Sequence, residues 1–325
     1  MTLVTRLRSL SLPHALLIPA QAVGEALLRT LRGAVALAGD LVRRVTGPLG
    51  SAAAESAAGE TPPVPTRRER GGLLRLAALV VPPLSVGLGV LSSARGWFGP
   101  SIEELSDRQN TGLLILPVNG AFGIWGPIYA GLLGLAAAQA LGAGRNNPRY
   151  VRARLPLIVN MVFNFVWFVV TQREERFASV AVLIGQFVTA LWLYHALEIP
   201  RVRVRGLERV LRVSASLYAG WLTVASVISI AGLLEFVGFT GLGLSAPAWA
   251  VVMLIACAAI GLTGRFAWRD PVYGAVFVWA FSGVAIKAGQ PESVAVTAWA
   301  LAGVMLLSLL PPLARRLTPA PDREG

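Results

Sequence analysis

The side chains of this chain that offer a binding site are aromatic and amide groups, set at helical spacing within apolar segments. Phe122, Trp125 and Tyr129 are spaced i, i+3, i+7, so they share one face of a helix. Two later apolar segments carry similar stripes, at Asn160, Asn164 and Trp167 and at Tyr218, Trp221 and Ala225. Aromatic faces stack on planar rings, and a few amides fix a ligand's orientation in an apolar pocket. We therefore expect the three stripes to line one shared pocket.

Residues for several other kinds of chemistry are missing. The single Cys257 excludes a disulfide within the chain, and His14 and His195 lie far apart, so we expect no metal centre and no required cofactor. The glycine-rich segment 241–244 lacks the Lys-Ser/Thr ending of a phosphate-binding loop. We find neither paired carboxylates nor a serine in an elbow sequence. Hydrolytic and nucleotide-driven reactions are therefore unsupported.

The composition is that of a membrane protein. Of 325 residues, 55% are hydrophobic and only 14% are charged, against about a quarter charged in soluble domains. The mean hydropathy is +0.63. The fold class we predict is all-α, a polytopic helix bundle of about eight spans. They lie near residues 72–93, 119–142, 155–171, 177–197, 213–234, 247–263, 271–287 and 294–314.

The net charge of +12 follows the membrane topology rather than a nucleic-acid site. Arginine-rich segments alternate along the chain with segments poor in net positive charge, and the rich ones lie near 67–75, 145–154, 201–212, 265–269 and 315–316. The positive-inside rule then places both termini in the cytoplasm, and we expect a bacterial cytoplasmic membrane protein. The centres of the spans lack ionisable residues, which disfavours a proton-driven transporter.

The chain outside the spans divides into further segments. Residues 1–46 have the pattern of an amphipathic helix, lying in the membrane interface or packed on the protein's cytoplasmic face. A signal peptide with Ala20-Gln21-Ala22 as its cleavage site is a third interpretation. We expect a flexible linker at 47–70, a five-helix core at 71–234, three additional helices at 235–316 and a tail at 317–325.

Two residue types in the stripes have a structural as well as a functional interpretation. Asn160 and Asn164 each form either an interhelical hydrogen bond or a polar contact to a ligand. Trp125 and Trp167 belong either to the interfacial tryptophan belt or to the pocket, whereas Trp221 lies too deep for the belt. Small residues at 131–144 favour close helix packing, within the chain or between the chains of a homodimer.

The stripes resemble motifs of the translocator protein family, also called tryptophan-rich sensory proteins. The family's second helix carries Trp-x-x-Leu-Tyr after a phenylalanine, and Trp125 to Tyr129 after Phe122 is similar. Its third helix carries Leu-Asn-x-x-Trp, here with Phe163 in place of the leucine. Its fifth helix carries Tyr-x-x-Trp followed by alanine and asparagine, here with Ser229 in place of the asparagine. The tryptophan- and proline-rich first loop of the family is reduced to Trp97 and Pro100.

The resemblance implies a five-helix bundle that binds porphyrins or other tetrapyrroles, heme included, or sterol-like lipids. The site residues carried over or predicted are Phe122, Trp125, Tyr129, Asn160, Asn164, Trp167, Tyr218 and Trp221. We expect the pocket to open on the outer side beneath loop 94–118, with membrane lipid and the ligand as partners and a sensory, scavenging or transport role. The alternatives are a permease for a small hydrophobic metabolite, light-dependent porphyrin breakdown as some relatives are associated with, and a scaffold without ligand.

Overall fold

A computed structural model describes residues 67–109, 112–199, 201–202, 204–239 and 241–310, and these residues form helices joined by short loops. The long helices are α2 (Arg67–Arg95), α4 (Trp125–Ala138), α5 (Pro148–Gln172), α6 (Arg176–Ala196), α7 (Gly206–Phe236), α8 (Ala246–Ala267), α9 (Pro271–Ala285) and α10 (Glu292–Leu309). The short α3 (Ile102–Gln109) follows α2, and the 3-10 helix η3 (Asn119–Ile124) runs directly into α4. The predicted all-α bundle is confirmed.

Within the described part of the chain, seven helical segments are long and apolar enough to cross a membrane, with η3 and α4 counted as one segment. The remaining predicted span, 271–287, corresponds to α9, which is apolar but has only 15 residues, or about 22 Å of helix. Its start is well defined, because Pro271 occupies the first turn and Asp270 Oδ1 accepts hydrogen bonds from the backbone of Val272 and Tyr273.

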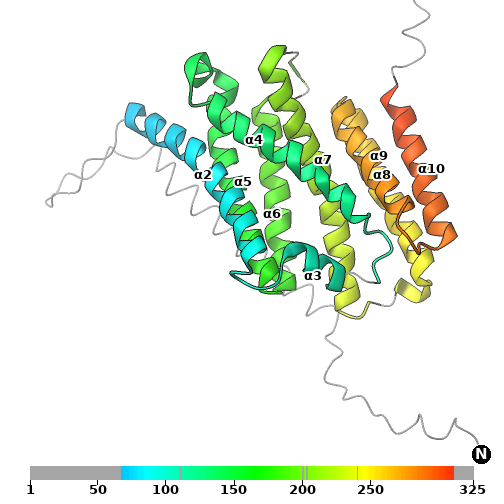
Figure 1. The fold of residues 1–325 in the computed structure, drawn as a ribbon. Coiled ribbons are helices and arrows are strands. Elements are labelled where there is room, and N and C mark those ends of the chain that lie inside the picture. The colour runs from blue at the N-terminus through cyan, green and yellow to red at the C-terminus, as the bar shows by residue number, and fades with distance from the viewer. Residues whose placement is uncertain (1–66, 110–111, 200, 203, 240, 311–325) are drawn as a thin grey trace, which may run out of the picture.

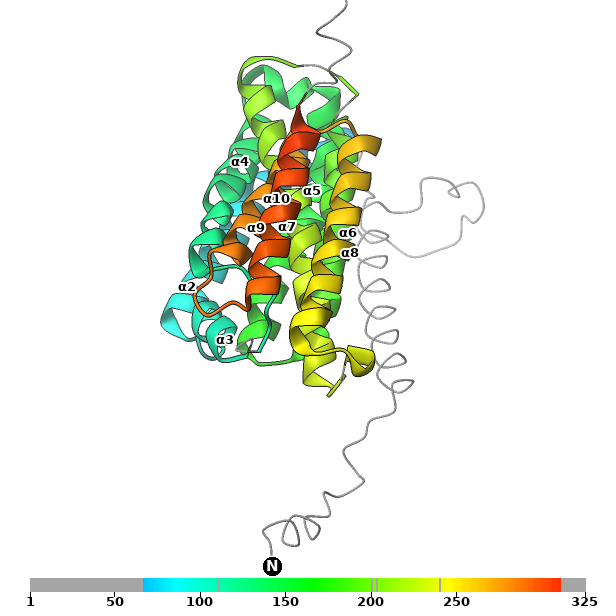
Figure 2. The ribbon, with the colours of Figure 1, turned by 90° about the vertical axis from the view of Figure 1, so that its right-hand side faces the viewer.

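Five helices form a ring. In order of contact around it they are α2, α5, α6, α7 and α4, and α4 closes the ring against α2. Helices α8, α9 and α10 pack on one another and cover one side of the ring through contacts of α9 and α8 with α7 (Figures 1 and 2). Gly220 permits the close approach of α7 to α9, because an added Cβ would lie 2.9 Å from Val276 Cγ2.

The two ends of the bundle differ in charge. The start of α2, the α4–α5, α6–α7 and α8–α9 connections and the end of α10 share one end, here called the arginine-rich face (Figure 1). There Arg149 Nε lies 2.6 Å from Glu208 Oε1 and joins α5 to α7, while Arg152 pairs with Glu198 after α6. Helix α3 lies across the opposite end (Figure 1).

Several predicted boundaries require correction. Helix α2 begins at Arg67, so residues 67–70 are helical rather than linker, whereas residues 1–66 and 311–325 lie outside the described part. Helices α5 and α7 begin seven residues before the predicted spans, because their first two turns carry polar residues that form ion pairs and hydrogen bonds at the arginine-rich face. Of the small residues at 131–144, Gly131 and Gly134 pack within the chain, against Ser214 and Leu211 of α7.

Candidate ligand-binding pocket

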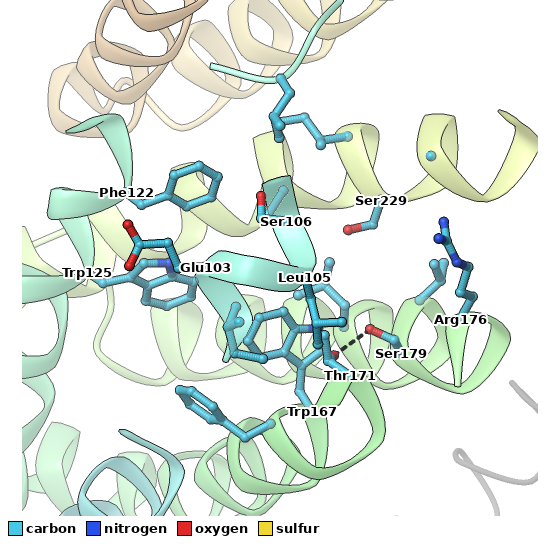
Figure 3. A pocket seen from close by; sticks show the side chains of 18 of the residues that line it. Glu103, Leu105, Ser106, Phe122, Trp125, Trp167, Thr171, Arg176, Ser179 and Ser229 are labelled. Carbon is cyan, nitrogen blue, oxygen red and sulfur yellow. Dashed lines mark hydrogen bonds between the residues drawn. The ribbon is translucent and has the colours of Figure 1, made fainter. Parts of the chain in front are cut away.

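The five-helix ring encloses a cavity of about 500 Å³ near the end that α3 covers. Its walls come from α2, α3, η3, α4, α5, α6 and α7 (Figure 3). Pockets for drug-sized ligands fall in the range of about 300–1,000 Å³ and are lined mainly by apolar and aromatic side chains. The volume and the lining both suit a small hydrophobic molecule.

Aromatic rings from three helices form one wall of the cavity. Trp125 stacks on Tyr129 with ring centroids 5.1 Å apart and 21° between the planes. Trp221 stands edge-on to both Phe122, at 5.6 Å, and Trp125, at 6.4 Å. Trp167 of α5 lines the cavity as well. The aromatic rings pack against one another and so hold each other in place. Together they present a stacking surface to the cavity.

Helix α3 forms part of the cavity's outer wall. Ile102 and Leu105 line the cavity, and Leu105 is fully buried. Arg108 Nη2 lies 3.4 Å from Glu174 Oε1 in the α5–α6 turn, so an ion pair connects α3 to the ring. Both groups are about half exposed, and such pairs contribute little free energy. Apolar contact by Leu105 is the stronger attachment of α3.

A buried hydrogen-bond network adjoins the cavity through Tyr129. The Tyr129 hydroxyl donates to Asn164 Oδ1 at 3.0 Å, and Gln186 Nε2 donates to the same oxygen at 3.0 Å. Asn164 Nδ2 donates to Ser85 Oγ at 3.1 Å, and that hydroxyl donates to the backbone oxygen of Met161. Tyr129, Asn164, Gln186 and Ser85 thus connect α4, α5, α6 and α2.

The network continues to α7. Gln186 Nε2 donates to the Tyr218 hydroxyl at 2.7 Å, and Tyr218 donates to Asn160 Oδ1 at 2.8 Å. Asn160 Nδ2 in turn donates to Thr189 Oγ1 at 2.9 Å and to the backbone oxygen of Gln186. All five helices of the ring therefore contribute a side chain to one network. It satisfies the amides of Asn160 and Asn164, which an apolar surrounding would otherwise penalise.

The structure separates the eight predicted site residues into two groups. Those that line the cavity are Phe122, Trp125, Tyr129, Trp167 and Trp221. The other three, Asn160, Asn164 and Tyr218, do not line it and lie buried in the network. Of the two interpretations given for Asn160 and Asn164, the structure shows the interhelical hydrogen bonds. A binding role for any of the eight stays a prediction.

Helix α9 fixes the segment that carries Phe122 and Trp125. Trp279 Nε1 donates to the backbone oxygen of Ala121 at 2.8 Å, and the backbone nitrogen of Val118 donates to Gly283 O at 2.9 Å. Gln290 Nε2, just after α9, donates to Leu114 O at 2.6 Å. These bonds join residues more than 150 positions apart and set the entry of the chain into α4.

Sequence reasoning missed the part of the lining outside the three stripes. It includes Ile102, Glu103 and Leu105 of α3, Thr171 and Ser179 across the α5–α6 turn, and Arg176. Helix α3 is short and polar in composition, so its sequence gives no sign of a cavity wall. The only available indication was the prediction that loop 94–118 lies over the pocket.

The fold and the pocket define a class, the polytopic helical membrane proteins with an aromatic cavity inside a five-helix ring. The chain belongs to the TSPO-like protein family, whose family model matches residues 75–310. That match includes α8, α9 and α10 as well as the five-helix ring. No curated protein and no solved structure matches the chain.

Proposed function

We propose that this integral membrane protein binds a planar hydrophobic ligand, of the porphyrin or tetrapyrrole class or a sterol-like lipid, in the α3-covered cavity. The observation that carries the proposal is the aromatic wall, in which the stacked Trp125 and Tyr129 and the edge-on Trp221 border a space of about 500 Å³. A flat ring system gains from stacking on such surfaces beyond the burial of its area.

The bundle has a defined orientation in the membrane under this proposal. The arginine-rich face lies in the cytoplasm by the positive-inside rule, which puts α3 and the cavity at the outer side of the membrane. A hydrophobic ligand then enters from the outer leaflet or the outer aqueous phase. Both termini lie in the cytoplasm in this arrangement.

The test is direct titration of the purified full-length protein with protoporphyrin, followed by the porphyrin's own visible absorbance. Because the reporter is the ligand, removal of a tryptophan does not remove the signal. Trp125→Phe and Trp167→Phe keep an apolar ring but lose the indole surface. We expect each to weaken binding about two- to tenfold, the range that an aromatic contact provides.

Trp299→Phe is the matched control, because Trp299 lies on α10, is 52% exposed and does not line the cavity. We expect its affinity to equal that of the wild type. Failure to observe saturable binding in a protein shown to be folded would contradict the proposal. Equal loss in all three variants would show that the porphyrin binds elsewhere.

A further inference from the structure

The cavity has two chemically different ends. Phe122 and Trp125 lie at one end, whereas Ser179, Ser229 and Arg176 lie toward the other (Figure 3). The aromatic end suits a flat ring system, with the Glu103 carboxylate beside Trp125 (Figure 3), and the hydroxyls and the guanidinium offer polar contacts at the other end. A ligand that fills the cavity therefore meets hydroxyls and a guanidinium at one end.

Arg176 is the group at the polar end that discriminates between ligands. Of the described residues that line the cavity, it alone is basic. Its side chain is half-buried, and its guanidinium carbon lies 4.6 Å from the centroid of the Phe236 ring. Among the ion pairs formed by described residues, none includes Arg176, while the neighbouring Glu174 is paired with Arg108. The Phe236 ring holds the guanidinium without neutralising it.

We propose that Arg176 binds a carboxylate of the ligand, so that the cavity selects a planar hydrophobic molecule with one acidic group at its edge. The proposal rests on the proposed function and names the ligand class for the same cavity. A guanidinium presents paired N–H donors that match the two oxygens of a carboxylate. The position of Arg176 directs that group to the polar end and the ring system to Trp125.

The surrounding carboxylates disfavour a second acidic group on the ligand. Glu103, Glu174 and Glu175 also line the cavity with exposed side chains. Glu174 is paired with Arg108, and the other two form no ion pair among the described residues. A second acidic group on the ligand meets one of these like charges rather than another arginine, and like charges at close range repel. Neutral ligands lose the Arg176 contact, and ligands with two acids gain repulsion.

The experiment compares protoporphyrin, which has two carboxylates, with its monomethyl and dimethyl esters. Each is titrated into the full-length protein in neutral detergent free of anionic lipid and followed by its own absorbance. We expect the monoester to bind about three- to tenfold more tightly than the diester. The Arg176 guanidinium is half-buried, so its pairing with a carboxylate contributes less binding free energy than a fully buried ion pair would. Arg176→Gln should remove that difference.

Arg173→Gln is the matched control, because Arg173 is exposed in the same turn and does not line the cavity. It changes the net charge near the cavity equally and should keep the preference for the monoester. Equal affinity of wild type for monoester and diester, or an unchanged preference in Arg176→Gln, overturns the inference while the proposed function stands. Binding of none of the three porphyrins overturns the proposed function and this inference with it.

Discussion

At the scale of single residues, Gln186 is the junction of the buried network. Its amide nitrogen donates to both Asn164 Oδ1 and the Tyr218 hydroxyl, at 3.0 and 2.7 Å, and its side chain is almost fully buried. Its Oε1 accepts no hydrogen bond from the described residues, so the Gln186 side chain is held only by the two hydrogen bonds that its Nε2 donates. Loss of the amide leaves the two acceptors with fewer donors in an apolar surrounding.

Gln186→Leu should therefore destabilise the bundle by about 1–3 kcal/mol, the cost of leaving buried polar groups unpaired. The measurement is thermal unfolding of the detergent-solubilised protein. Thr263→Val is the control, because the exposed Thr263 hydroxyl bonds only to Ala259 O of its own helix. An equal shift in the two variants would show that the network adds no stability of its own.

At the scale of helices, α4 and α7 pack so closely that only glycine fits between them at residue 131. A Cβ added at Gly131 would lie about 2 Å from Ser214 Cβ, well inside van der Waals contact. We expect Gly131→Ala to cost about 1–3 kcal/mol in stability by overpacking. Gly303→Ala on α10 has open space around the new Cβ and should be neutral or slightly stabilising. The measurement is the unfolding midpoint of each variant, and equal midpoints for Gly131→Ala and Gly303→Ala would contradict the prediction.

Hydrogen bonds of α9 with Val118 and Ala121 hold the chain segment that leads into α4. Trp279→Phe removes the hydrogen bond to Ala121 O but keeps an aromatic ring beside η3. Because this bond positions the segment that carries Phe122 and Trp125, we expect ligand affinity to fall about two- to fivefold. Porphyrin titration together with an unfolding scan separates a displaced pocket from a destabilised fold.

The half-exposed Trp299 of α10 provides the control for that experiment, since Trp299→Phe changes a tryptophan that faces away from the pocket. Unchanged affinity in Trp279→Phe would mean that the backbone bond from Val118 to Gly283 suffices to position the segment. Reduced affinity with an unchanged unfolding midpoint would assign α9 a positioning role in ligand binding.

At the scale of the whole molecule, the unequal ends of the bundle predict its orientation in the membrane. The native Cys257 is buried, so single cysteines introduced into loops can be labelled selectively. Ala288→Cys lies in the exposed α9–α10 turn and Arg201→Cys in the exposed α6–α7 turn. A membrane-impermeant thiol reagent should label the first in intact cells and the second only after permeabilisation. The reverse pattern would place the cavity on the cytoplasmic side.

Hydropathy was sufficient to predict the long apolar helices, although not the short polar α3. A helix rises about 1.5 Å per residue, so a hydrocarbon core of about 30 Å sets the length of apolar sequence that a crossing helix needs. Helical periodicity likewise placed Phe122, Trp125 and Tyr129 on one face, and all three border the cavity. Helix length and the face on which a side chain lies depend on local sequence, so a single sequence is enough to predict them.

Tertiary packing alone decided which neighbour each face meets. Asn160 and Asn164 lie on the predicted stripe, yet their amides reach α6, α7 and α2 rather than the cavity, because satisfying buried polar groups outweighs exposing them to an empty space. The covering by α3, the placement of Arg176 and the bond from Trp279 to Ala121 join segments distant in sequence. Periodicity defines the direction of a side chain, but only the assembled ring defines what lies opposite it.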